Sequence, residues 1–93
     1  MNLNKIDVKL QFLMENGNIE DFKVLVIAYH LSHRYREELL LLGVDIYAGE
    51  YVHAYPAILS KKIIEILSEK SYVNRIVLDI EDEKWDIIVQ EKE

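Results

Sequence analysis

Residues 30–43 read HLSHRYREELLLLG, and the rest of the chain is organised around this stretch. Ser32 is a residue type that caps the start of a helix, and Gly43 is the type that most often ends one. The stretch therefore predicts a helix over about residues 33–42. It also holds two of the three histidines, so both packing and chemistry could depend on it.

The leucines of this helix spread over a wider arc than one packing partner needs. One stripe at helical spacing holds four apolar side chains: Leu31, Tyr35, Leu39 and Leu42. Leu40 and Leu41 fall outside that stripe, although a helix on a two-layer domain buries a single face. We therefore expect a second surface, such as a second subunit, to cover them.

N-terminal to this helix, every second residue is apolar over residues 5–14, which is typical of a half-buried strand. The alternating positions are Ile6, Val8, Leu10, Phe12 and Met14. An amphipathic helix ending at Gly17 is the alternative, because three of the apolar residues also fit helical spacing. Five consecutive matches to a period of two favour the strand.

Asn16-Gly17-Asn18 then predicts a tight hairpin loop. A three-residue loop places Phe12 opposite Phe22 and keeps the apolar residues of both strands on one face. The second strand, within residues 19–29, is apolar on its other face as well. It is therefore expected to be a central strand of the sheet.

Beyond the helix, residues 44–55 are expected to form a loop with a short strand near 51–54. Pro56 suits the first position of a helix, so a second helix is predicted over about residues 56–70. A second hairpin follows, in which residues 75–80 pair with residues 85–90 across a turn at 81–84. This register places six apolar side chains on one face in the pairs Ile80–Trp85, Leu78–Ile87 and Ile76–Val89.

The elements together predict one α+β domain over residues 1–93. Its mostly antiparallel sheet comes from two β-hairpins plus a short middle strand and packs against two helices. The predicted order is β-β-α-(β)-α-β-β.

Composition excludes several classes of protein. With no cysteine, the chain forms no disulfide or thiolate metal site, which suits the cytoplasm. Its longest uncharged apolar runs are far shorter than the roughly 20 residues of a membrane span, and no signal pattern is present. We expect neither a membrane anchor nor export.

The net charge of −6 is concentrated at the C-terminus, where residues 79–93 hold seven acidic residues and two lysines. An acidic surface repels phosphate backbones, so nucleic acid is not expected as a partner. Solubility alone accounts for such a charge. The alternative is a basic protein partner that meets Glu81, Asp82 and Glu83.

Three residues could hold a metal ion if one helix carried them all. His30, His33 and Glu37 have the spacing i, i+3 and i+7, and two imidazoles with a carboxylate can bind zinc or iron. The HExxH arrangement of zinc enzymes is missing. A polar helix face is the better interpretation, and no cofactor is expected.

His53 stands among tyrosines just before Pro56. A histidine beside a helix N-terminus could cleave a phosphodiester in RNA or a cyclic oligonucleotide by general acid-base catalysis. An exposed histidine packed among tyrosines is the commoner arrangement, because no partner residue lies at a fixed spacing. His53, or the pair His30 and His33, is therefore the candidate for an alternative, enzymatic function.

Tyr47, Tyr51 and Tyr55 recur every four residues. Tyrosine is enriched at protein interfaces, but in a domain this small the three could equally pack at the edge of the core. With the leucine arc and the localised acidic charge, they favour a small homodimeric interaction or regulatory protein. Inhibitors, immunity proteins and accessory factors of mobile elements are proteins of this kind.

Overall fold

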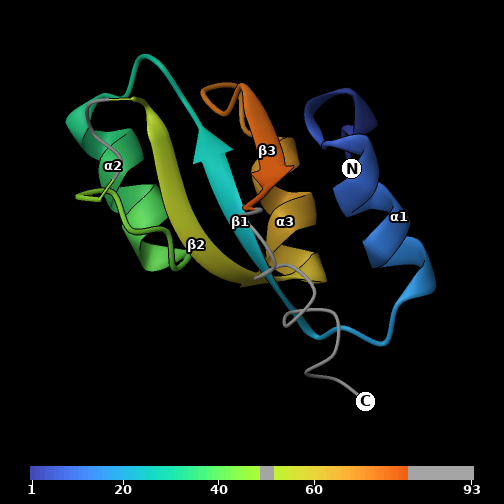
Figure 1. The fold of residues 1–93 in the computed structure, drawn as a ribbon. Coiled ribbons are helices and arrows are strands. Elements are labelled where there is room, and N and C mark those ends of the chain that lie inside the picture. Colours follow the sequence, from blue (N-terminus) through green and yellow to red (C-terminus); the bar gives the residue numbers. More distant parts are fainter. Residues whose placement is uncertain (49–51, 80–93) are drawn as a thin grey trace.

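The structure, a computed structural model, describes residues 1–48 and 52–79. Figure 1 shows its elements, which follow in the order η1 (Leu3–Lys5, a 3-10 turn), α1 (Val8–Asn16), β1 (Asp21–Ile27), α2 (His33–Leu41), β2 (Ala54–Ser60), α3 (Lys61–Ser68) and β3 (Arg75–Leu78). The predicted α+β class with an antiparallel sheet is confirmed. The second half of the predicted C-terminal hairpin lies outside the described residues.

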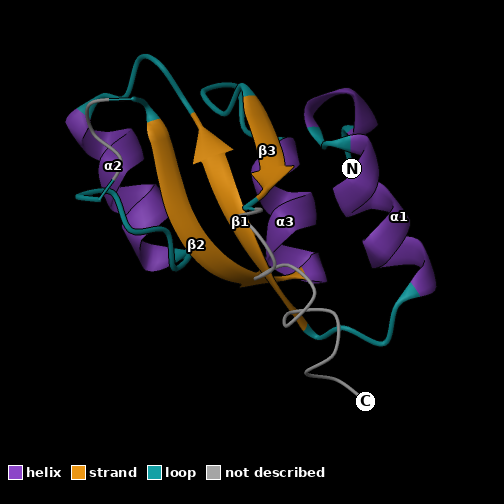
Figure 2. Cartoon of the chain, in the orientation of Figure 1, coloured by secondary structure: helices purple, strands orange, loops and turns teal. Residues whose placement is uncertain are grey.

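The sheet has the strand order β2-β1-β3, and β1 is antiparallel to both neighbours (Figure 2). Its register places Val26 between Tyr55 on β2 and Ile76 on β3. The central position predicted for the strand within residues 19–29 is therefore confirmed. Its partners are two later strands, and neither is the N-terminal segment.

One face of the sheet forms the core. Phe22, Val24 and Val26 of β1 are buried and alternate with half-buried residues. The buried side chains of α1, α2 and α3 join the same cluster, and Figure 1 shows α3 crossing behind the strands. We call the opposite face the outer face. Its side chains are half-buried or exposed and include the apolar residues Leu25, Ile27, Pro56, Ile58 and Val77.

The strand predicted over residues 5–14 is wrong, because this segment forms helix α1. Leu10 and Met14 are buried one turn apart, whereas Val8 and Phe12 are exposed on the other side of the helix. The helix ends at Gly17, whose N–H donates to the carbonyl of Leu13. The N-terminal hairpin is consequently absent, and the helical alternative is the correct one.

The helix predicted to begin at Pro56 begins at Lys61 instead, because Pro56 lies within the edge strand β2. The Pro56 carbonyl accepts a hydrogen bond from Asp45 N–H at 2.9 Å, so this residue turns its backbone polar groups away from β1. A proline there removes no hydrogen bond between the two strands, which is why an edge strand tolerates it. Ser60 caps α3, since its Oγ accepts a hydrogen bond from Ile63 N–H at 3.3 Å.

The helix predicted over residues 33–42 is confirmed as α2. Ser32 Oγ accepts a hydrogen bond from Tyr35 N–H at 3.2 Å, as an N-cap should. At the other end Gly43 has φ of 100°, a left-handed conformation that glycine adopts without strain. Both ends of this helix follow from local side-chain chemistry.

Candidate interaction surface

The residues predicted as metal ligands do not gather. His30 lies before the Ser32 cap and so is not on α2. His33 Nε2 lies 2.9 Å from Glu37 Oε1 across one helical turn, and both side chains are exposed. Among the described residues, no group of three histidine or carboxylate side chains could hold a metal ion. The i, i+3, i+7 spacing required a continuous helix, and the cap at Ser32 interrupts it.

His53 lies directly before β2 in a left-handed conformation, with φ of 57°. Its carbonyl accepts a hydrogen bond from Ala28 N–H at 3.0 Å, which extends the pairing of β1 with β2 by one residue. The imidazole meets the ring of Tyr29 edge to face, with centroids 5.6 Å apart. Tyr29 N–H in turn donates to Asn74 Oδ1 at 3.2 Å, so three segments converge around this exposed histidine.

The predicted tyrosine series does not form one exposed surface. Tyr55 is 1% exposed and belongs to the core, opposite Val26. Tyr47 is 76% exposed, and its N–H donates a hydrogen bond to Asp45 Oδ1 at 3.1 Å. Tyr51 lies outside the described residues, as do Glu81, Asp82 and Glu83.

The two leucines predicted to lie outside the helix stripe are indeed exposed. Leu41 is 86% exposed and Leu40 is 48% exposed, while Leu39 of the same helix is fully buried. From Leu41 the chain turns at Gly43 toward the edge of β2. There Val44 forms an antiparallel bridge with Ala57, next to the hydrogen bond between Asp45 and Pro56.

This approach of residues 43–45 to β2 creates a shallow hollow of about 390 Å³ on the protein surface. It is lined by Lys23, Gly43, Asp45, Pro56, Ala57 and Ile58. Ile58 is 68% exposed, which is a large apolar exposure for a side chain on a strand. We call these six residues the β2 surface.

Two opposite charges flank the apolar part of the β2 surface. Lys23 on β1 pairs with Ile58, so its side chain lies on the same face of the sheet as Ile58, on the side of β2 that borders β1. Asp45 lies along the outer edge of the same strand, through its backbone hydrogen bond to Pro56. β2 therefore lies between a cationic and an anionic side chain. Lys23 Nζ also lies 4.0 Å from Asp79 Oδ2.

Sequence reasoning missed the β2 surface, because its residues come from three separate segments. Two weak signals were present in the sequence: an uncharged run over residues 54–60, and a glycine followed by Val44, whose partner is Ala57. Neither could be interpreted without knowing that β2 is an edge strand. Pro56 also suits the first turn of a helix, so the sequence around it favours a helix over an edge strand.

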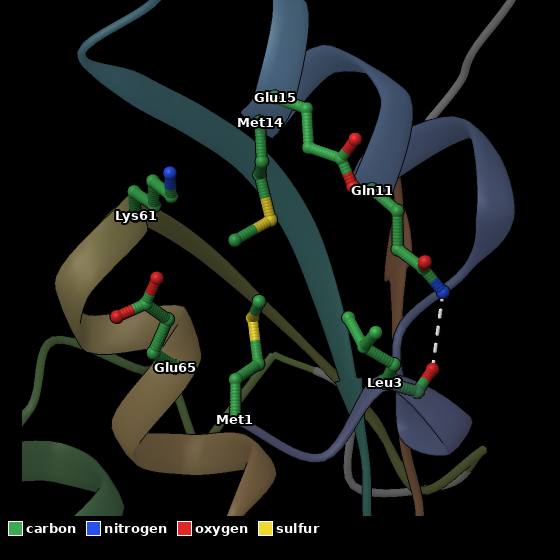
Figure 3. A pocket seen from close by; sticks show the side chains of 7 residues that line it. All are labelled: Met1, Leu3, Gln11, Met14, Glu15, Lys61 and Glu65. Carbon is green, nitrogen blue, oxygen red and sulfur yellow. Dashed lines mark hydrogen bonds between the residues drawn. The ribbon is translucent and has the colours of Figure 1, made fainter.

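A second hollow lies between the N-terminal segment, α1 and α3, and its volume is about 70 Å³. Figure 3 shows the side chains of Met1 and Met14 extending toward each other inside a rim that includes Glu15, Lys61 and Glu65. Gln11 Nε2 closes one side by donating to the Leu3 carbonyl at 3.0 Å. A space of this size holds a few water molecules. It does not suit a larger ligand.

Comparison of the chain with protein-family models, with curated proteins and with solved structures found no match. No helix within the described residues is both long and apolar enough to cross a membrane. Function must therefore be argued from the surface of the chain itself.

Proposed function

We propose that this protein is a small homodimeric interaction module with a regulatory role. The observation that supports this proposal is the exposure of large apolar side chains on the β2 surface and within two residues of it along the chain. Ile58 and the nearby chain residues Leu41 and Tyr47 are each more than 60% exposed in a single chain. Burying apolar and aromatic side chains of this size against a partner is favourable and stabilises a complex.

The acidic residues Glu81, Asp82 and Glu83 extend the proposal to a basic partner protein. The charge of residues 79–93 would attract such a partner and accelerate its association, in a way that salt weakens. Self-association and partner binding are separate properties, so each needs its own measurement.

Sedimentation velocity of the full chain over a wide concentration range tests self-association. We expect a concentration-dependent shift from monomer to dimer; a monomer at every concentration would overturn the homodimer. For partner binding, proteins captured by the wild-type chain are compared with those captured by the variant Glu81→Gln, Asp82→Asn, Glu83→Gln. The proposal of a basic partner fails if that variant retains every captured protein.

A second candidate function, cleavage of RNA or a cyclic oligonucleotide, draws support from one observation. His53 combines an exposed imidazole with a left-handed backbone, and such conformations cluster at functional sites. Tyr29 beside it offers a ring on which a base could stack. Incubation with RNA and cyclic oligonucleotides, with and without a chelator, tests this function. Turnover that disappears in His53→Ala supports it, and no turnover by the wild-type chain excludes it.

A further inference from the structure

We infer that a second copy of this chain packs face to face on the β2 surface, with a two-fold axis that runs along β2. This inference rests on the proposed homodimer and specifies where the two copies meet. In this arrangement Ile58 of one copy contacts Ile58 of the other. Lys23 of each copy then lies opposite Asp45 of its partner.

The symmetry follows from the order of groups across the strand. Lys23 lies on one side of β2, Asp45 lies on the other, and the exposed Ile58 lies between them. A two-fold interface must be self-complementary, because both copies present the same patch. Rotation about an axis along β2 exchanges its two sides, so it brings each cation to the same side as the partner's anion. Lys23 is level with Ile58 and Asp45 with Pro56, so the two charges are displaced by two residues along the strand. Rotation about an axis across β2 in the plane of the surface would place like charges opposite each other.

The chemistry of the patch also favours a second copy over a strongly charged partner. Lys23, which lies 4.0 Å from Asp79, would repel a basic protein on one side of the patch, and Asp45 would repel an acidic protein on the other. The apolar centre formed by Pro56 and Ile58 needs an apolar surface opposite it, and the second copy supplies an identical one.

The expected affinity is modest. The β2 surface spans parts of two strands and one loop, so the buried area should fall at or below the roughly 1,200 Å² that stable complexes exceed. We therefore expect a dissociation constant in the micromolar range and measurable weakening by salt. Sedimentation should cover concentrations from about 1 µM to about 1 mM around that value.

The decisive experiment exchanges the two charges. In a dimer of Lys23→Glu, residues 23 and 45 of the two copies form two pairs of acidic side chains, and in a dimer of Asp45→Lys they form two pairs of lysines. Each single variant should therefore raise the dissociation constant at least about tenfold. An equimolar mixture of these two variants restores both attractive pairs, so it should form a one-to-one heterodimer. The double variant Lys23→Glu, Asp45→Lys should self-associate again for the same reason.

Ile58→Asp tests the apolar centre and should also leave a monomer. Phe12→Ser is the matched control, because Phe12 is 63% exposed on α1, whose buried residues pack on the core face of the sheet. Thermal unfolding of each variant shows whether it is folded. Since Lys23 also lies near Asp79, Lys23→Gln provides a version without repulsion inside the chain.

The outcomes separate the two proposals. A wild-type chain that stays monomeric overturns the homodimer and this inference together. A wild-type dimer that survives Ile58→Asp, that Phe12→Ser dissociates, or whose charge variants do not recover on mixing overturns this inference alone. Dissociation by the single charge variants and recovery in their mixture establish it, because misfolded chains would not recover by mixing.

Discussion

Tyr72 Oη donates a hydrogen bond of 2.7 Å to Glu38 Oε1, and this contact fastens α2 to the segment between α3 and β3. The ring of Tyr72 stacks on Tyr35, with centroids 4.1 Å apart and planes 13° apart. Lys70 Nζ lies 3.6 Å from the same carboxylate oxygen. Because Leu39 is the one buried residue of α2, these polar and aromatic contacts hold much of the helix in place.

Removing the hydroxyl group in Tyr72→Phe should lower the melting temperature by a few degrees and loosen α2. The loss leaves Glu38 without its shortest hydrogen bond, while the ring can still stack on Tyr35. Hydrogen exchange should accelerate at the amides of α2 more than at those of α3. Tyr47→Phe is the control, because Tyr47 is exposed, and equal effects of the two substitutions would contradict the assignment.

Stability should also fall in alkaline solution because of Tyr72. Burial and the hydrogen bond to Glu38 raise the pKa of this hydroxyl above its ordinary value of 10.0. The unfolded chain then loses the proton before the folded chain does, so the stabilisation is complete below pH 10.0 and is lost as the pH rises above it. Thermal melts between pH 8 and pH 12, about two pH units on either side of the ordinary pKa of tyrosine, measure this loss. Tyr72→Phe should show a shallower decline, and an unchanged decline would refute the explanation.

Acid should also weaken the contact between Tyr72 and Glu38, because it protonates the Glu38 carboxylate. The hydrogen bond from Tyr72, together with Lys70 and Arg34, holds the pKa of Glu38 below its ordinary value. Its contribution is therefore present above the pKa of an unfolded glutamate and disappears as the pH falls through the lowered value. The wild-type chain should lose stability relative to Glu38→Gln over this acid range. Parallel melting curves of the two proteins would contradict this expectation.

Truncation of two leucines of α2 should have very different effects on stability. Leu39→Ala opens space in the core and should cost about 2–5 kcal/mol, since Leu39 is fully buried. Leu41→Ala removes an exposed side chain and should change the free energy of unfolding by less than about 0.5 kcal/mol in the monomer. Urea denaturation at low protein concentration measures both values. A large effect of Leu41→Ala would mean that the helix faces are assigned wrongly.

Gly43→Ala should destabilise the chain by about 1 kcal/mol, because φ of 100° is unfavourable for residues with a Cβ atom. The new methyl group has room, since its nearest neighbour is Leu59 Cδ2 at 3.5 Å, so the cost is conformational. Gly43→Asn should cost less, because asparagine adopts left-handed conformations more readily. Equal stability of the glycine and alanine proteins would show that the turn relaxes.

Local capping signals made α2 predictable, whereas residues 5–14 were ambiguous for a geometric reason. Residues four apart always have the same parity, so the buried pair Leu10 and Met14 of α1 also fits an alternating pattern. The exposed pair Val8 and Phe12 adds apolar residues at two more even positions and completes an apparent strand.

 The helix at Val8–Asn16 could not be recognised from periodicity alone, because its buried pair fits both periods and its exposed apolar pair fits the alternation as well.

The β2 surface was not predictable for a different reason. Lys23, Asp45 and Ile58 are separated in the chain, and they meet only because β2 pairs with β1 in one particular register. Proline has two common uses, the first turn of a helix and an edge strand, and residues around Pro56 fit both. Only the pairing partner, here Asp45, decides between them.

The position of β1 in the middle of the sheet has a consequence for how the chain folds. Ile27 pairs with Ala54 and with Arg75, so both ladders of β1 join residues that are distant in the sequence. No local hairpin can therefore nucleate the described sheet, and loop-closure entropy must be overcome before any strand pairing forms. We expect slower folding than in helical domains of this size, and on the ribosome β1 must wait unpaired until β2 and then β3 have been synthesised.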